Sequence, residues 1–113
     1  MDEKLGDGQR ASPAAASSPV KLALSPVAIE DLERVGRFLE ERNPTAAARA
    51  SQLIREAMLS IGRMPGRGRI VPEDGARRLS VAFGRGAYII DYRIDEDSGI
   101  ALILRVRHSR EAR

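Results

Sequence analysis

The chain has 113 residues, no cysteine, one histidine and a formal charge of +3, and its length suits a single domain. Without cysteine there is no disulfide and no thiolate metal ligand, and one histidine excludes a centre built from several histidines. No run of about 18 apolar residues is present, so the sequence predicts no membrane-spanning helix.

The basic residues are unusual in kind and in position. All but two of the 19 are arginine, and residues 63–113 hold 11 basic and 7 acidic groups. Arginine binds phosphates and carboxylates in a fork and stays charged, so this half of the chain favours an anionic partner. The alternative is a GC-rich genome that encodes most basic residues as arginine.

Residues 1–19 are small, polar and rich in Pro, Ser and Ala. Such a segment buries too little apolar surface to offset the entropy lost on ordering, so we expect a disordered N-terminal extension. The folded domain is then expected over residues 20–110.

Two cap signals predict a helical hairpin. Residues 20–24 alternate as a short strand, and Ser25-Pro26 then combines an N-cap with proline at the first helical position. Asn43-Pro44 repeats this signal. Helices are predicted over about 17 residues from Pro26 and from Pro44 to about residue 61, where Gly62 is expected to stop the second. Because one or two residues join them, they must turn back on each other.

The apolar period then changes from helical to two. A basic loop at 63–77 rich in Gly and Pro precedes three runs at 79–83, 88–94 and 100–106, which predict a three-stranded meander. The predicted fold is α+β, in the order β-α-α-β-β-β. A helical hairpin packs on one face of a small, mainly antiparallel curved sheet.

Most charged residues of the predicted strands occupy the alternate positions, which point away from the apolar face. The uncovered face is expected to carry Arg78, Arg93, Arg105 and Arg107 with Ile89 and Ile103. The loop leading to it carries Arg67, Arg69 and Arg77, and His108 and Arg110 lie at its exit. Such a face suits an RNA backbone or an acidic amphipathic peptide. The alternative is a solvated face with ordinary cross-strand pairs, such as Asp91 to an arginine.

Other candidates for chemistry are few. His108 is the candidate general acid or base because histidine is the side chain best suited to move protons at neutral pH, although a lone histidine is more often structural or merely exposed. Tyr88 and Tyr92 fall on the apolar parity and are expected in the core. Glu30 and Asp31 are expected on a solvated helix face.

In order and spacing, these residues resemble the RelE/ParE superfamily of type II toxins, nearer to the ParE branch. The resemblance covers about residues 20–110. It is carried by Ala28, Asp31, Leu32, Asn43-Pro44, Ala46, Ala47, Arg49, Pro65, Gly68-Arg69, Arg78-Leu79, Tyr88, Tyr92-Arg93 and the stretch from Ile103 to Arg110.

The resemblance implies a small cytoplasmic toxin with no cofactor. It also implies a cognate antitoxin whose C-terminal segment wraps the toxin across the hairpin and sheet. The charged and apolar side chains of the uncovered face and its flanks, from Arg67 to Arg110, are then the expected antitoxin- or target-binding set. ParE-like members inhibit DNA gyrase, whereas RelE-like members are ribosome-dependent mRNA endonucleases.

Cleavage of mRNA requires groups that move protons and stabilise charge. Arg78 and Arg105 have the required charge, but no lysine follows Lys21, no tyrosine follows Tyr92, and His108 is the only late proton-transfer candidate. Gyrase inhibition is therefore the leading hypothesis. An mRNA endonuclease using Arg78, Arg105 and His108 is the alternative, and a non-toxic remnant that only binds the antitoxin is a third.

Overall fold

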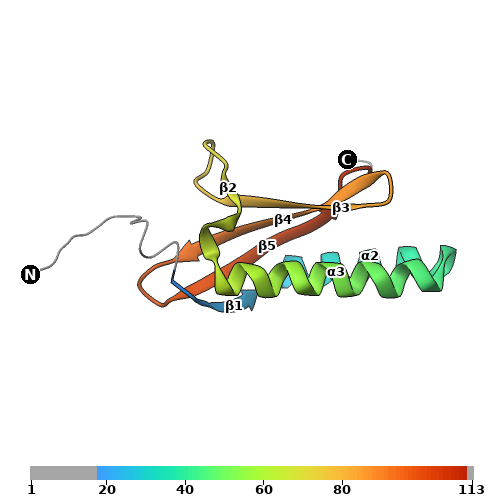
Figure 1. Ribbon diagram of the computed structural model, residues 1–113, viewed down its shortest axis with the longest axis horizontal. Helices are drawn as coiled ribbons and strands as arrows, with labels where there is room; N and C mark the ends of the chain where they lie inside the picture. Colours follow the sequence, from blue (N-terminus) through green and yellow to red (C-terminus); the bar gives the residue numbers. More distant parts are fainter. Residues whose placement is uncertain (1–17, 112–113) are drawn as a thin grey trace, which may run out of the picture.

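The structure is a computed structural model that describes residues 18–111 (Figure 1). The predicted disordered extension lies almost wholly outside the described residues. Within 18–111, no helix combines the length and apolar character that crossing a bilayer requires.

The helical hairpin forms as predicted. Helix α2 spans Pro26–Arg42, and the Oγ of Ser25 accepts the Ala28 N–H at 3.0 Å. Helix α3 spans Pro44–Arg63, and the Oδ1 of Asn43 accepts the Ala46 N–H at 3.1 Å. Asn43 alone joins the two helices, so α3 must return along α2.

Gly62 does not stop α3, contrary to the prediction, because the helix continues to Arg63. The carbonyl of Gly62 accepts the Val20 N–H at 2.8 Å, and an added Cβ would lie 3.4 Å from the Val20 carbonyl oxygen. A Cβ at position 62 would therefore make ordinary van der Waals contact with the segment that enters the sheet.

The sheet has five strands in the order β1-β5-β4-β3-β2. They are β1 (Lys21–Leu24), β2 (Arg69–Ile70), β3 (Arg77–Phe83), β4 (Gly86–Asp95) and β5 (Ile100–His108). Strand β1 pairs parallel to β5 and every other pair is antiparallel, so the predicted α+β order is confirmed. The 3-10 turn η1 (Pro65–Arg67) and the two-residue β2 were not predicted.

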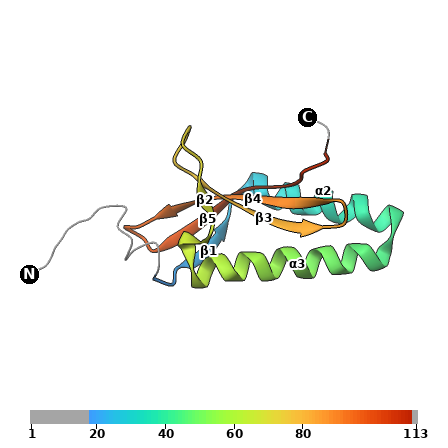
Figure 2. The ribbon, with the colours of Figure 1, turned by 45° about the horizontal axis from the view of Figure 1, so that its top comes forward.

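Both helices lie on one side of the sheet, and the segment between β2 and β3 projects on the other side (Figures 1 and 2). The core fills the space between the layers. Its members include Ala28 and Val35 of α2, Ala50, Ile54, Ala57 and Ile61 of α3, and Leu79, Tyr88, Ile90, Tyr92 and Val106 of the sheet. The alanines of α3 keep the helix close to the sheet.

A β-bulge in β5 changes which residues enter this core. Asp91 pairs with Arg105 while Tyr92 pairs with Ile103, so Leu104 is an extra residue. A bulge shifts the alternation of side chains by one position. Ile103 is therefore fully buried in the core, and its predicted place on the uncovered face is wrong. Leu102, which pairs with Arg93, lies on that face instead.

Candidate functional site

The uncovered side of the sheet carries a charged surface, here called the basic sheet face. Its arginines are Arg69, Arg78, Arg93, Arg105 and Arg107, and Asp91 and the half-buried Ile89 lie among them. Cross-strand partners share a face, and Asp91 alternates with the core residues Ile90 and Tyr92. Arg78, Arg93 and Arg107 thus share one side of the sheet, and Arg105 occupies the same register row but binds Asp31 of α2.

Arg78 and Asp91 form the main ion pair on this face. The Nε of Arg78 donates to Asp91 Oδ1 at 2.7 Å, and Nη2 donates to Oδ2 at 3.3 Å. This paired fork raises the pKa of the Arg78 guanidinium, and it is the cross-strand pair that the sequence offered as an alternative to ligand binding. Arg78 is therefore already held by a carboxylate of its own chain.

Arg105 is held by a second carboxylate, from α2. Asp31 is only 2% exposed, contrary to the prediction of a solvated position. Its Oδ2 accepts both the Arg105 Nε at 2.8 Å and the Val106 N–H at 2.8 Å, and its Oδ1 accepts Arg34 Nη1 at 2.7 Å. Strand β1 ends at Leu24, so Asp31 satisfies an edge N–H of β5 that β1 leaves unpaired.

The electrostatics of Asp31 follow from this geometry. Burial raises the pKa of its carboxyl, but hydrogen bonds from Arg105, Arg34 and the Val106 N–H outweigh burial and lower the pKa from 3.8 to about 2. The same bond raises the pKa of Arg105. This buried carboxylate joins α2 to β5 as a structural ion pair.

Tyr92 positions the loop that carries Arg67 and Arg69. Its hydroxyl donates to the Pro65 carbonyl at 2.6 Å and accepts the Gly68 N–H at 2.8 Å. Tyr92 is fully buried, as predicted, and burial raises its pKa. A Cβ on Gly68 would lie 2.8 Å from the Tyr92 hydroxyl oxygen, so only glycine fits there without a shift.

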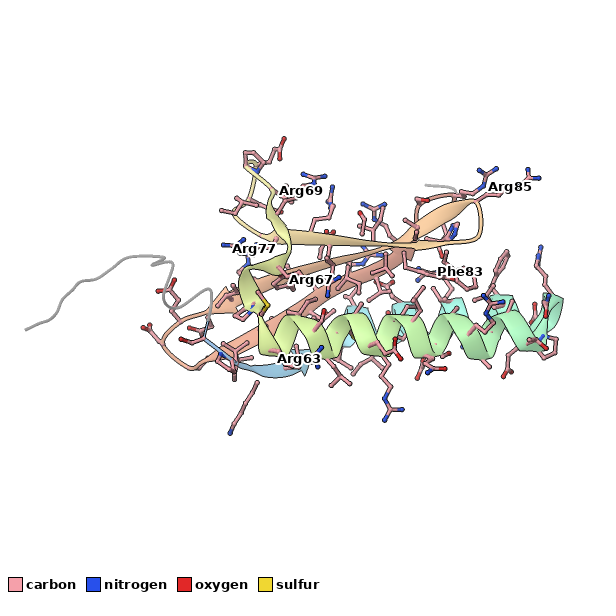
Figure 3. The ribbon with its side chains drawn as sticks, viewed as in Figure 1. Arg63, Arg67, Arg69, Arg77, Phe83 and Arg85 are labelled. Carbon is pink, nitrogen blue, oxygen red and sulfur yellow. The ribbon has the colours of Figure 1, made fainter. Side chains whose placement is uncertain are left out.

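A cavity of about 570 Å³ lies between α2 and the ends of β3, β4 and β5, and we call it the hairpin pocket. It is lined by Arg34, Val35, Phe38, Leu39, Phe83, Tyr88, His108, Arg110 and Glu111. Phe83 points into the space between the β3–β4 turn and the helices (Figure 3). The pocket thus has an apolar floor with charged groups at its rim, which suits an apolar group next to a charged one.

His108 belongs to this pocket. It pairs with the core residue Tyr88, and the two rings meet edge to face with centroids 5.0 Å apart. The Nδ1 of His108 accepts the Arg110 N–H at 3.1 Å. His108 therefore faces the helices, on the opposite side of the sheet from Arg78.

The sequence model of one protein family, the ParE toxin of type II toxin–antitoxin systems (parDE), matches residues 22–113 of the chain. The chain belongs to the ParE toxin family. This membership confirms the resemblance drawn from the sequence, and the chain is a toxin of the type II toxin–antitoxin class.

Curated relatives of this ParE-family toxin include two from Caulobacter vibrioides. Toxin RelE1 is 39% identical over 83 residues, covering 74% of this chain and 86% of the relative. Toxin RelE3 is 37% identical over 90 residues, covering 80% and 95%. The family that matches this chain is named ParE, whereas these two relatives are named RelE.

Solved structures of toxin–antitoxin systems share the fold of this ParE-family toxin. The chromosomal ParDE system from P. aeruginosa matches with a TM-score of 0.63 at 22% identity, covering 79% of this chain and 95% of that one. The RelBE2 toxin–antitoxin complex from Mycobacterium tuberculosis matches with a TM-score of 0.53 at 26% identity, covering 83% and 95%.

Sequence reasoning missed two parts of this toxin's candidate site. Arg34 and Phe38 of α2 line the hairpin pocket, but a helix pattern alone does not show which polar face meets the end of β5. The spacing of Asp31 weakly indicated a place in the candidate site, because Asp31 lies on the same helix face as Val27, Arg34 and Phe38. The structure explains the acidic residue at position 31, because β1 ends at Leu24 and leaves the Val106 N–H to be bound by Asp31.

Proposed function

We propose that this toxin inhibits DNA gyrase by binding, and that a cognate antitoxin neutralises it. The observation that carries the proposal concerns the three candidate nuclease residues. Arg78 is bound to Asp91 on the uncovered side of the sheet, Arg105 is bound to Asp31 of α2, and His108 faces the helices on the opposite side of the sheet from Arg78.

Cleavage of a phosphodiester needs a proton donor or acceptor and a charge-stabilising group around one phosphate. Here both arginines already neutralise carboxylates of the chain. His108, the candidate acid or base, is packed against Tyr88 across the sheet. A single phosphate that met His108 in the hairpin pocket would not meet Arg78. The arrangement disfavours a nuclease site built from Arg78, Arg105 and His108, and this supports inhibition by binding.

The antitoxin is expected to use two surfaces. An acidic amphipathic segment would place an apolar side chain in the hairpin pocket beside Phe38 and its carboxylates near Arg34 and Arg110. Its continuation would meet Ile89 and Arg93 on the basic sheet face. Solved structures with this fold are titled as ParDE and RelBE toxin–antitoxin systems, which supports a partner of this class.

The test uses purified gyrase and induced cells in parallel. The full chain should block supercoiling of relaxed plasmid in vitro, and its induction should arrest growth with an SOS response. His108→Ala should inhibit gyrase as strongly as the wild type. Active gyrase together with cleaved ribosome-bound mRNA would refute the proposal.

An mRNA endonuclease is the second candidate, because the two curated relatives are named RelE toxins. It requires that His108→Ala or Arg78→Ala abolish both toxicity and mRNA cleavage. Harmless expression of a soluble, folded chain would instead indicate a remnant that only binds the antitoxin.

A further inference from the structure

One register row of the sheet is strongly basic. Arg69, Arg78, Asp91 and Arg105 are successive partners across β2, β3, β4 and β5. With neighbouring strands about 4.8 Å apart, this row spans about 14 Å. Arg93 and Arg107 lie on the same face in the rows on either side. The carboxylates near these arginines are Asp91 in the row itself, Asp31, which holds Arg105, and Glu73 and Asp74 of the loop before β3, which act on Arg78.

Several of these cations are available to a partner. Among the described residues, Arg69, Arg93 and Arg107 form no ion pair with a carboxylate. The Nη1 of Arg93 donates to the Asp74 backbone carbonyl at 2.8 Å, which holds the side chain in place without neutralising it. Figure 3 shows Arg69 on the side of the sheet away from the helices. The face therefore presents positioned positive charge.

The rest of the face limits what the partner can be. Ser80 and Ala82 are exposed and small, while Phe83, Tyr88 and Tyr92 belong to the helix side of the sheet. Within residues 18–111, this face therefore offers no aromatic platform on which unpaired bases could stack. The cavity that would anchor a peptide side chain lies on the helix side as well. What remains is an open array of cations, which fits a regular array of phosphates.

We propose that the basic sheet face binds the phosphate backbone of duplex DNA without sequence specificity. The inference rests on the proposed function, because gyrase, the proposed target, acts on duplex DNA. The toxin would then engage gyrase and its DNA together. The helix side would then hold protein alone, and on the basic sheet face DNA would compete with the continuation of the antitoxin segment.

The experiment measures binding of the full chain to a fluorescent 20-base-pair duplex by anisotropy, as a function of NaCl and without gyrase. Each phosphate contact contributes about −0.9 to the slope of log K against log salt, so three to five contacts predict a slope of about −3 to −4.5. The variant R69Q/R107Q should lower the steepness by about 2 and weaken binding at least about tenfold in 100 mM salt.

A matched control removes the same charge elsewhere. Arg49 and Arg55 are exposed on α3, so R49Q/R55Q should weaken duplex binding less than about twofold. Equal loss in both double variants would overturn the proposal, as would a single strand or an RNA hairpin that binds more tightly than the duplex. Polyglutamate that displaces the duplex at equal charge would assign the face to an acidic protein instead.

The failure of this inference is distinct from that of the proposed function. If R69Q/R107Q still inhibits gyrase fully while its duplex binding is lost, the proposed inhibition of gyrase stands and the role of DNA binding in that inhibition is refuted. If the wild type binds duplex but leaves gyrase active, the DNA site stands and the proposed target is wrong.

Discussion

Replacing Asp31 by asparagine tests the buried ion pair that joins α2 to β5. Asparagine keeps the size of the side chain and an oxygen that accepts the Val106 N–H, but it removes the charge that Arg105 and Arg34 meet. Both arginines are partly exposed, at 51% and 42% of their side chains, so water can solvate them after the change. The variant should therefore fold, with lower stability.

The magnitude follows from the pKa of Asp31. A fall from 3.8 to about 2 corresponds to about 2 kcal/mol of folding free energy, since one pKa unit is about 1.4 kcal/mol. Because the folded pKa lies below the unfolded one, this stabilisation is complete above about pH 5. It declines as the pH falls below 3.8 and is lost below about pH 2, where the carboxyl is protonated in both states.

The assay is urea denaturation followed by circular dichroism at pH 7, 5, 4 and 3. The difference between the wild type and D31N should be about 2 kcal/mol at pH 7 and 5 and should shrink at pH 4 and 3. Glu30→Gln removes a charge from the exposed neighbour and should change stability by less than about 0.5 kcal/mol. A D31N penalty that is the same at pH 7 and pH 3 would refute the reasoning.

Three further changes test the loop, the bulge and the pocket. Tyr92→Phe should cost about 1–3 kcal/mol and speed hydrogen exchange at the Gly68 amide, and unchanged exchange would contradict the hydroxyl's role. Ile103→Ala should cost about 2–5 kcal/mol in urea denaturation and Leu102→Ala clearly less, whereas the reverse order would mean that the bulge is misplaced. Phe38→Ala should weaken antitoxin binding in calorimetry at least about tenfold. Its matched control is Leu59→Ala, an equally exposed apolar residue outside the pocket (52% and 49%), and equal loss in both would exclude the pocket.

Local sequence signals were sufficient for the helices and for the side of the sheet that β4 buries. The caps at Ser25 and Asn43 act within one helical turn, and the single linking residue forces the hairpin. Tyr92 lies between Asp91 and Arg93, and Tyr88 falls on the same strand parity, so their burial was readable from period two alone. The family resemblance drew on the same order of elements.

Other features depend on contacts between distant segments. Leu102, Ile103 and Leu104 are all apolar, so their alternation does not specify a phase, and the pairing with Asp91 and Tyr92 sets the bulge. The same uncertainty explains why Ile103 was expected on the wrong side. The loop at 63–70 became η1 and β2 because Tyr92 binds it at two backbone positions.

The +3 charge and the arginine excess of residues 63–113 are set by composition, and composition alone indicates an anionic partner. Composition does not say which arginines are neutralised, because an ion pair depends on which strands and helices meet. Strand β1 ends immediately before the Ser25 cap of α2, which leaves an edge of β5 to Asp31 and thereby binds Arg105. Asp91 binds Arg78 across the sheet, and His108 faces the helices. Tertiary structure alone therefore divides one basic region into structural ion pairs and a surface able to bind phosphates.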